Sequence, residues 1–140
     1  MAEAVTMAGG CLCGAVRYRC TQPAKIQFEC HCRDCQKVTG GPYAPIMFFP
    51  QEAVEIRGEV RWYESAGGSG RPIRRGFCPT CGAQMFGIVE IVPGTVSIRA
   101  GTLDDPSQFQ PRVHIYASQA APWDHLDPAL PSFAERPPSR

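Results

Sequence analysis

The spacing of the cysteines is the feature of this chain most directly tied to chemistry. Seven of the eight cysteines form three short clusters: Cys11 and Cys13; Cys30, Cys32 and Cys35; Cys78 and Cys81. A structural zinc ion takes four protein ligands, whereas a reactive zinc ion keeps one position for water or substrate. Seven thiols therefore fit one closed site of four and one open site of three, and a reaction could occur at the open site.

The last cluster carries the strongest local signal. Two residues separate Cys78 from Cys81, and Gly82 follows, which is typical of a tight turn that points both sulfurs at one ion. A thioredoxin-type redox pair has the same spacing but needs a βαβ context that this chain lacks. Cys11 and Cys13 are weaker evidence alone, although the glycines around them allow the sharp bend that two near neighbours need to reach one metal.

The middle cluster places three sulfurs within six residues. In an extended segment Cys30 and Cys32 point to the same side, and a turn would bring in Cys35. His31 should point the other way, which favours a place beside the site over a place as its fourth ligand. Cys20 stands alone in a β-rich segment and is interpreted as a small buried apolar residue.

Spacing alone leaves two ways to divide the ligands. Cys32 and Cys35 could join Cys78 and Cys81 in a ribbon-like site, but the 42 intervening residues exceed the usual ribbon spacing. The alternative joins Cys11 and Cys13 to the last pair and leaves Cys30, Cys32 and Cys35 as an open site. We favour the second division, because three thiols from one short segment need no distant partner.

Length and composition predict one domain spanning residues 1–140, with flexible ends at 1–8 and 131–140. The net charge of +1 shows no basic stripe, so nucleic acid is not an expected partner. The first ten residues lack the pattern of a signal peptide, and no apolar run is long enough to span a membrane. We therefore expect a cytoplasmic protein with reduced thiols, and a disulfide framework is the less favoured alternative.

Short runs rich in Val, Ile, Tyr and Phe alternate with turn signals, which predicts an all-β fold. Gly58-Glu59 is interpreted as a hairpin turn and Gly67–Gly70 as a flexible loop. Short helical turns are expected at Cys32–Val38 and at Leu103–Phe109, where an Asp could cap the turn ahead of Pro106. The expected strands are Ala15–Cys20, Ile26–Cys30, Ala44–Phe49, Val54–Arg57, Val60–Glu64, Ile73–Phe77, Gln84–Ile88, Val96–Ala100 and Val113–Ala117.

Several other side chains have both a functional and a structural interpretation. A substrate carboxylate could be held by Arg33, Lys37, Arg74 or Arg75, but solvated surface charge is the favoured interpretation for each. Asp34 is more simply a carboxylate at a helix start than a base. His114 is favoured as a structural histidine. Phe48, Phe49 and Trp123 are favoured as core residues.

Three motifs together resemble one known family. They are Gly10–Tyr18 (GCLCGAVRY), Cys30–Lys37 (CHCRDCQK) and Gly76–Gly82 (GFCPTCG), followed by Gly101–Pro106, Pro111, His114–Tyr116 and Ala121–Trp123. The pattern is similar to that of the glutathione-dependent formaldehyde-activating enzymes, which include centromere protein V. The resemblance covers roughly Gly9 to Trp123. It implies a β-tent fold of stacked antiparallel sheets and two zinc ions, one structural on Cys11, Cys13, Cys78 and Cys81 and one open on Cys30, Cys32 and Cys35.

The resemblance also implies an activity, that of a carbon–sulfur lyase or synthase similar to S-(hydroxymethyl)glutathione synthase. Its partners would be a small thiol, with glutathione as one candidate, and an aldehyde such as formaldehyde. Cys30, Cys32 and Cys35 would be the catalytic residues. A non-catalytic zinc module that binds a protein or nucleic acid is the main alternative, and a redox or metal-sensing role for oxidisable thiolates is a third.

Overall fold

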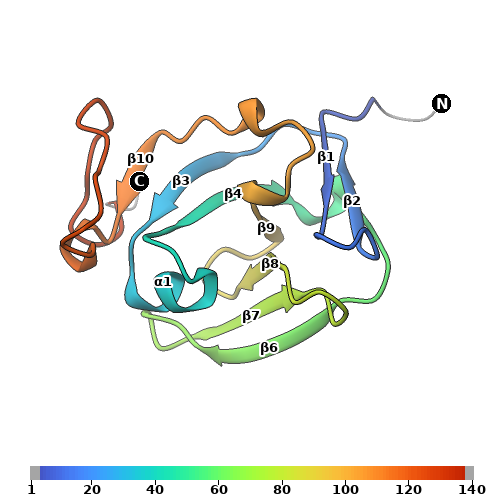
Figure 1. Cartoon of the computed structure of the whole chain (residues 1–140), viewed down its shortest axis with the longest axis horizontal. Helices are drawn as coiled ribbons and strands as arrows, with labels where there is room; N and C mark the ends of the chain where they lie inside the picture. Colours follow the sequence, from blue (N-terminus) through green and yellow to red (C-terminus); the bar gives the residue numbers. More distant parts are fainter. Residues whose placement is uncertain (1–3, 138–140) are drawn as a thin grey trace.

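Residues 4–137 are described in the computed structural model of the chain. Residues 1–3 and 138–140, which belong to the ends expected to be flexible, lie outside the described residues. Within residues 4–137 there are ten strands and one α-helix, arranged as in Figure 1. They are β1 (Met7–Gly10), β2 (Arg17–Cys20), β3 (Ile26–Cys30), α1 (Arg33–Thr39), β4 (Ala44–Pro50), β5 (Val54–Arg57), β6 (Arg61–Ala66), β7 (Pro72–Phe77), β8 (Gln84–Val89), β9 (Thr95–Arg99) and β10 (Val113–Ile115).

The strands form two sheets, which confirms the all-β expectation. The smaller sheet has the order β1-β2-β5, and the larger has the order β10-β3-β4-β9-β8-β7-β6. All strand pairs are antiparallel except β10 with β3, which is parallel. The expected antiparallel pairing therefore holds except at the β10 edge of the larger sheet. In Figure 1, β1 and β2 lie at one end of the molecule and β10 with the C-terminal segment lies at the other.

The two faces of the larger sheet support two apolar clusters. Met47, Phe49 and Ile98 alternate onto one face and pack in the main core with Val16 and Tyr18 of the smaller sheet region. The other face carries a second cluster, which lies next to α1 and contains Phe28, Cys30, Cys35, Ala44, Ile46, Phe48 and Ile115. This alternation follows from the two-residue period of a strand, and it places Cys30 of β3 on the face that α1 covers, in the same cluster as Cys35 of α1.

All nine expected strands are present, two with the expected bounds and seven with ends shifted by one or two residues. Strand β1 was missed, because Met7–Gly10 contains two glycines and no β-branched residue. The sheet itself requires one of these glycines, since a Cβ at Gly9 would collide with the Thr102 carbonyl and the Tyr18 hydroxyl. Close backbone approach is a common reason for a glycine within a strand.

The expected hairpin at Gly58-Glu59 is wrong. Strand β5 pairs with β2 in the smaller sheet, whereas β6 pairs with β7 in the larger one. Gly58 has a φ of +100°, and a Cβ there would collide with the Ala15 carbonyl. This glycine therefore crosses from one sheet to the other. The Gly67–Gly70 loop is present and connects β6 to β7, which makes it the true hairpin loop.

Parts of both ends that were expected to be flexible belong to or lie along strands. Residues 7 and 8 belong to β1. Near the C-terminus, the Phe133 amide donates to the His114 carbonyl over 2.9 Å and the Tyr116 amide donates to the Glu135 carbonyl over 3.0 Å. Residues 131–135 therefore run along β10 and cover its outer edge.

Helical turns lie close to where they were expected. Helix α1 begins after Cys32, whose sulfur caps it, and ends at Gly40, which has a φ of +71°. Pro106–Gln108 forms a 3-10 turn in which the Asp105 carboxylate accepts a hydrogen bond from the Ser107 amide. At seven residues, α1 is too short to cross a bilayer, and the part of the chain described contains no other helix that could do so.

Candidate metal centre

Four thiols converge where the two sheets meet. Cys11 and Cys13 follow β1, and Cys78 and Cys81 follow β7. The sulfur–sulfur distances are 3.7 Å from Cys11 to Cys13 and 3.8 Å from Cys13 to Cys78. Four sulfurs about 2.3 Å from a tetrahedral zinc ion would lie about 3.8 Å apart. All eight cysteines are free thiols, and these distances are far from a disulfide bond. The arrangement fits a four-coordinate metal site.

Backbone amides also point at these sulfurs. The Val16 amide donates to the Cys11 sulfur over 3.2 Å, and the amides of Thr80 and Cys81 donate to the Cys78 sulfur over 3.4 Å. A hydrogen bond to the charged form of a group favours that form, so these amides favour the thiolates that a metal needs. Gly82, with a φ of +77°, closes the turn by donating its amide to the Cys78 carbonyl.

The three middle thiols come together on the face of the larger sheet that α1 covers. Cys30 ends β3, Cys32 caps α1, and Cys35 lies in the first turn of α1. The Cys35 amide donates to the Cys32 sulfur over 3.3 Å. Cys30 and Cys35 are buried and Cys32 is half-buried. Among the described residues, this group includes no fourth Cys, His, Asp or Glu donor.

The thiols of this group interact strongly. Hydrogen bonds from Cys30 and Cys35 lower the pKa of Cys32 to about 2. Donation to Cys32 and Cys35, together with burial, raises the pKa of Cys30 far above its ordinary value. The cluster by itself therefore favours one thiolate stabilised by two thiols, and a cation would be needed to hold all three as thiolates.

His31 faces away from the three thiols. Its Nδ1 lies 2.8 Å from a carboxylate oxygen of Asp124, and its Nε2 lies 3.0 Å from Nδ1 of His114. Burial lowers the pKa of His31, although the hydrogen bond with Asp124 opposes this shift. Both ring nitrogens are thus engaged on the opposite side of the strand. His114 is fully buried, as favoured for a structural histidine.

Two buried arginines share the sheet face of the three thiols. Arg75, Gly87 and Ser97 are direct neighbours across β7, β8 and β9, so their positions lie on one face. Arg99 lies two residues beyond Ser97 on the same strand, next to Ile46 of the cluster beneath α1. Burial lowers the pKa of Arg99, and attraction to the thiolate of Cys35 opposes that shift.

Arg99 was missed by sequence reasoning and is the most unusual polar group in this region. Its side chain is 7% exposed, and within residues 4–137 its Nε is the one buried side-chain nitrogen or oxygen without a hydrogen-bond partner. Native proteins pair nearly all such atoms, so an orphaned guanidinium nitrogen requires an explanation. In a strand, Ser97 and Arg99 point to the face opposite to the core residue Ile98. This alternation is the sequence feature that could have placed Arg99 on the second face of the sheet.

The four candidate carboxylate binders named from the sequence differ in their positions. Arg75 is buried and donates to the Ser65 hydroxyl over 2.9 Å, so it is not the surface charge expected. Arg74 stacks over Trp62 with its guanidinium carbon 4.9 Å from the ring centroid. Arg33, Asp34 and Lys37 are exposed on α1. Trp123 is 62% exposed, which contradicts its assignment to the core, whereas Phe48, Phe49 and Cys20 are buried.

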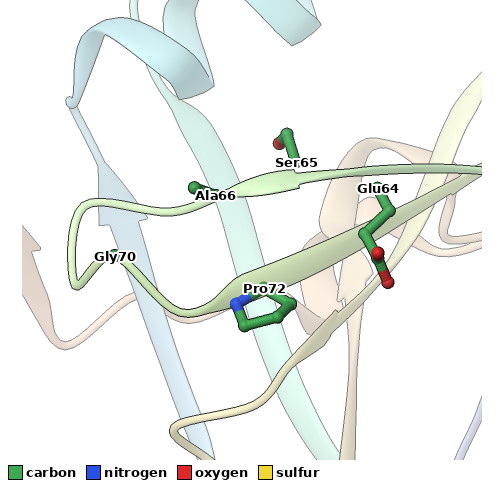
Figure 2. Close-up of a pocket in the computed structure, with 5 residues that line it drawn as sticks. All are labelled: Glu64, Ser65, Ala66, Gly70 and Pro72. Carbon is green, nitrogen blue, oxygen red and sulfur yellow. The ribbon is translucent and has the colours of Figure 1, made fainter.

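A surface hollow of about 250 Å³ lies at the loop end of the β6–β7 hairpin. Figure 2 shows Glu64 and Ser65 pointing to opposite sides of β6, with Ala66, Gly70 and Pro72 completing the lining. None of these residues belongs to a thiol cluster. Ser65 connects the hairpin to the buried arginines through its bond with Arg75, but the lining itself offers no metal-binding group other than one carboxylate.

The chain is similar to known proteins in sequence and in fold. The model of the family described as "Glutathione-dependent formaldehyde-activating enzyme" matches residues 6–119. A Halomonas elongata protein named "Putative glutathione-dependent formaldehyde-activating enzyme" is 27% identical over 125 residues, which cover 85% of this chain and 80% of that protein. A crystal structure of a Rhodobacter sphaeroides protein superposes with a TM-score of 0.55 at 21% identity, covering 70% of this chain and 88% of the other, and supports the fold. The chain belongs to the glutathione-dependent formaldehyde-activating enzyme family.

Proposed function

We propose that this protein is a zinc-dependent enzyme that makes and breaks the carbon–sulfur bond between a small thiol and an aldehyde, with glutathione and formaldehyde as the leading pair. The family and the name of the Halomonas elongata relative support the thiol and the aldehyde. The observation that carries the proposal is the set of Cys30, Cys32 and Cys35, three converging thiols whose group holds no fourth donor within the described chain.

The two thiol clusters suit different roles for two zinc ions. Cys11, Cys13, Cys78 and Cys81 supply a full tetrahedral set, which is typical of structural zinc. Cys30, Cys32 and Cys35 supply three ligands, which is typical of zinc that accepts a substrate. Zinc bound to the three thiols would hold a substrate thiol as its thiolate, the form that attacks carbon.

The proposed reaction is an addition without any change of oxidation state. The substrate sulfur forms a bond to the aldehyde carbon, the carbonyl π electrons move to oxygen, and the thiol proton ends on that oxygen. The product is a hemithioacetal, which is S-(hydroxymethyl)glutathione for the leading pair, and the reverse reaction is the lyase direction. Holding the two small reactants together can supply up to about 7–11 kcal/mol of the barrier reduction.

Arg99, with Arg75 nearby, is the proposed anchor for an anionic thiol. Glutathione carries two carboxylates at neutral pH, and a guanidinium can bind a carboxylate through two parallel hydrogen bonds. Arg99 lies on the sheet face of the three thiols and has an unpartnered Nε. A carboxylate at this nitrogen would complete its hydrogen bonding and would orient the thiol toward Cys30, Cys32 and Cys35.

Exchange NMR on the zinc-loaded protein tests the proposal. Formaldehyde and glutathione combine spontaneously, so the measured quantity is the exchange rate above the uncatalysed background. We expect catalysis by the wild type and its loss in Cys32→Ser, which removes one ligand of the open site. Cys20→Ala is the matched control, because Cys20 is buried in the core outside both clusters.

The outcomes separate the proposal from a binding-only role. Cys32→Ser should keep the circular dichroism spectrum of the wild type and lose one equivalent of zinc together with turnover. Unchanged turnover in a folded Cys32→Ser protein would refute the assignment of the open site. A wild type that holds zinc but accelerates exchange with none of glutathione, cysteine or 2-mercaptoethanol would refute the enzymatic proposal itself.

A further inference from the structure

A third group of potential metal ligands lies on the side of β3 opposite to the three thiols. Nε2 of His31 lies 3.0 Å from Nδ1 of His114, and Oε1 of Glu29 lies 3.2 Å from His114 Nδ1 and 3.9 Å from His31 Nε2. Both histidines are fully buried, and the Glu29 side chain is 14% exposed. Three potential ligand atoms therefore converge in a nearly closed space.

The parallel pairing of β10 with β3 creates this group. Glu29 and His114 are direct partners in the register, as are Cys30 and Ile115 one residue later. Because successive side chains of a strand point to opposite faces, Glu29 and His114 face away from Cys30. The group is thus distinct from the open thiol site, although the two are adjacent along the chain.

Hydrogen bonds on the outer nitrogens determine the tautomers of both rings. His114 Nε2 lies 3.2 Å from the Asp127 carbonyl, which can only accept, so this nitrogen carries its proton. His31 Nδ1 lies 2.8 Å from the Asp124 carboxylate, which as an anion also accepts. Each neutral ring then has a lone pair on its inner nitrogen, and the two lone pairs face each other.

When both rings are neutral and Glu29 is ionised, this arrangement leaves three acceptors pointing at one another with no donor between them. Buried acceptors in such contact repel one another unless a cation lies among them, and a metal ion satisfies all three at once. Metal-binding histidines commonly donate their other N–H to a carboxylate or a backbone carbonyl, which is the arrangement of His31 with Asp124 and of His114 with Asp127.

The distances agree with a transition-metal site. Ligands about 2.0–2.2 Å from a tetrahedral zinc ion lie about 3.3–3.6 Å from each other. The three edges observed here, 3.0, 3.2 and 3.9 Å, bracket that separation. Two histidines and a glutamate are an established ligand set for zinc, and imidazole also suits other late first-row metals. The partly exposed Glu29 gives an ion a way in.

We propose that Glu29, His31 and His114 form a third metal site, which binds zinc or a similar divalent transition ion through two imidazoles and a carboxylate. Such an ion would join β3 to β10 and would hold the C-terminal segment through Asp124 and Asp127. The site is independent of the proposed enzymatic function, because it uses none of the seven clustered cysteines.

Cobalt substitution of the full-length protein tests this site directly. Cobalt bound to thiolates gives intense sulfur-to-metal charge-transfer absorption, whereas cobalt bound to imidazole and carboxylate gives only weak ligand-field bands. We expect the wild type to bind one more equivalent of cobalt than the charge-transfer absorption accounts for. In His114→Gln that extra equivalent should be lost while the charge-transfer bands remain.

His125→Gln is the matched control, because His125 is exposed and lies outside the group. Glu29→Gln provides a second test in case His114→Gln does not fold, since it keeps both imidazoles and should weaken cobalt binding at least tenfold. Equal metal content in the wild type, His114→Gln and Glu29→Gln would overturn the proposal and indicate that the histidines share a proton. A failure of the thiol–aldehyde assay would leave this result unaffected.

Discussion

The four-thiol and three-thiol clusters are built in opposite ways. Cys13 and Cys78 are 65 residues apart, and their loops belong to different sheets. Cys30, Cys32 and Cys35 come from one six-residue segment on a single sheet. The comparison teaches that the two thiol clusters contribute differently to the topology. The complete ligand set joins distant parts of the chain, and the incomplete set adds little to the topology.

The two thiol clusters also differ in how deeply their cysteines are buried. The four-thiol cluster is the more accessible of the two, since Cys13 is exposed and Cys11 and Cys81 are half-buried. Two of the three thiols in the open cluster are buried beneath α1. A protected position for an incomplete ligand set would exclude bulk water and strengthen charge interactions there, which suits a reactive site.

The largest difference is expected between Cys78→Ser and Cys32→Ser. Cys78 is fully buried in the main core, and its cluster ties β1 to β7. Metal binding at structural zinc sites contributes about 10–16 kcal/mol in small zinc peptides, which is as large as the stability of a typical domain. We expect Cys78→Ser to lose its β-sheet circular dichroism and its cooperative thermal transition. Cys32→Ser should retain both, and a cooperative transition in both variants would contradict the contrast.

Metal release should separate the clusters next. A chelator can attack the three-thiol site through the position that no side chain occupies, whereas it must displace a cysteine at the four-thiol site. In the cobalt protein, the charge-transfer absorption should therefore decay in two phases, and the faster phase should be missing from Cys32→Ser. Should the fast phase survive in that variant, exposure of Cys13 rather than ligand number controls release.

Local features of both clusters could be predicted from the sequence, because each thiol pair or triplet lies within a few residues. Features that depend on which distant strands pair could not. The contact between Glu29 and His114 requires a parallel pairing of segments more than 80 residues apart, and the exposed position of Trp123 depends on the path of the C-terminal segment. Gly58 was misread because a tight hairpin and a crossing between sheets both favour glycine.

A smaller effect is expected from Arg99→Gln, which tests the open cluster alone. A charge-assisted hydrogen bond contributes about 1.5–3 kcal/mol, so KM for glutathione should rise about tenfold to a hundredfold. The rate with the uncharged thiol 2-mercaptoethanol should change little, and both thiol-bound metal ions should remain. Arg61→Gln is a suitable control, because Arg61 is exposed on β6. An equal loss for both thiols would show that Arg99 supports the fold rather than the substrate.

The smallest effect on stability is expected from removing the ion pair between Arg17 and Asp104, which lies at the four-thiol end of the molecule. Arg17 of β2 donates two hydrogen bonds to the Asp104 carboxylate, one of them over 2.8 Å. The hydrogen bond from Arg17 lowers the pKa of Asp104. A lowered pKa contributes stability above the ordinary carboxyl range, and this contribution is lost as pH falls through the folded-state pKa. Both side chains are about half exposed, so the pair contributes about 0.2–1 kcal/mol at neutral pH. Asp104→Asn should therefore lower Tm by at most about 4 °C at pH 7, and this difference should shrink as pH falls through the folded-state pKa of Asp104, whereas Glu59→Gln at an exposed position should leave Tm unchanged. Because neither Arg17 nor Asp104 belongs to the three-thiol cluster, the Tm shift should appear without any change in thiol–aldehyde exchange.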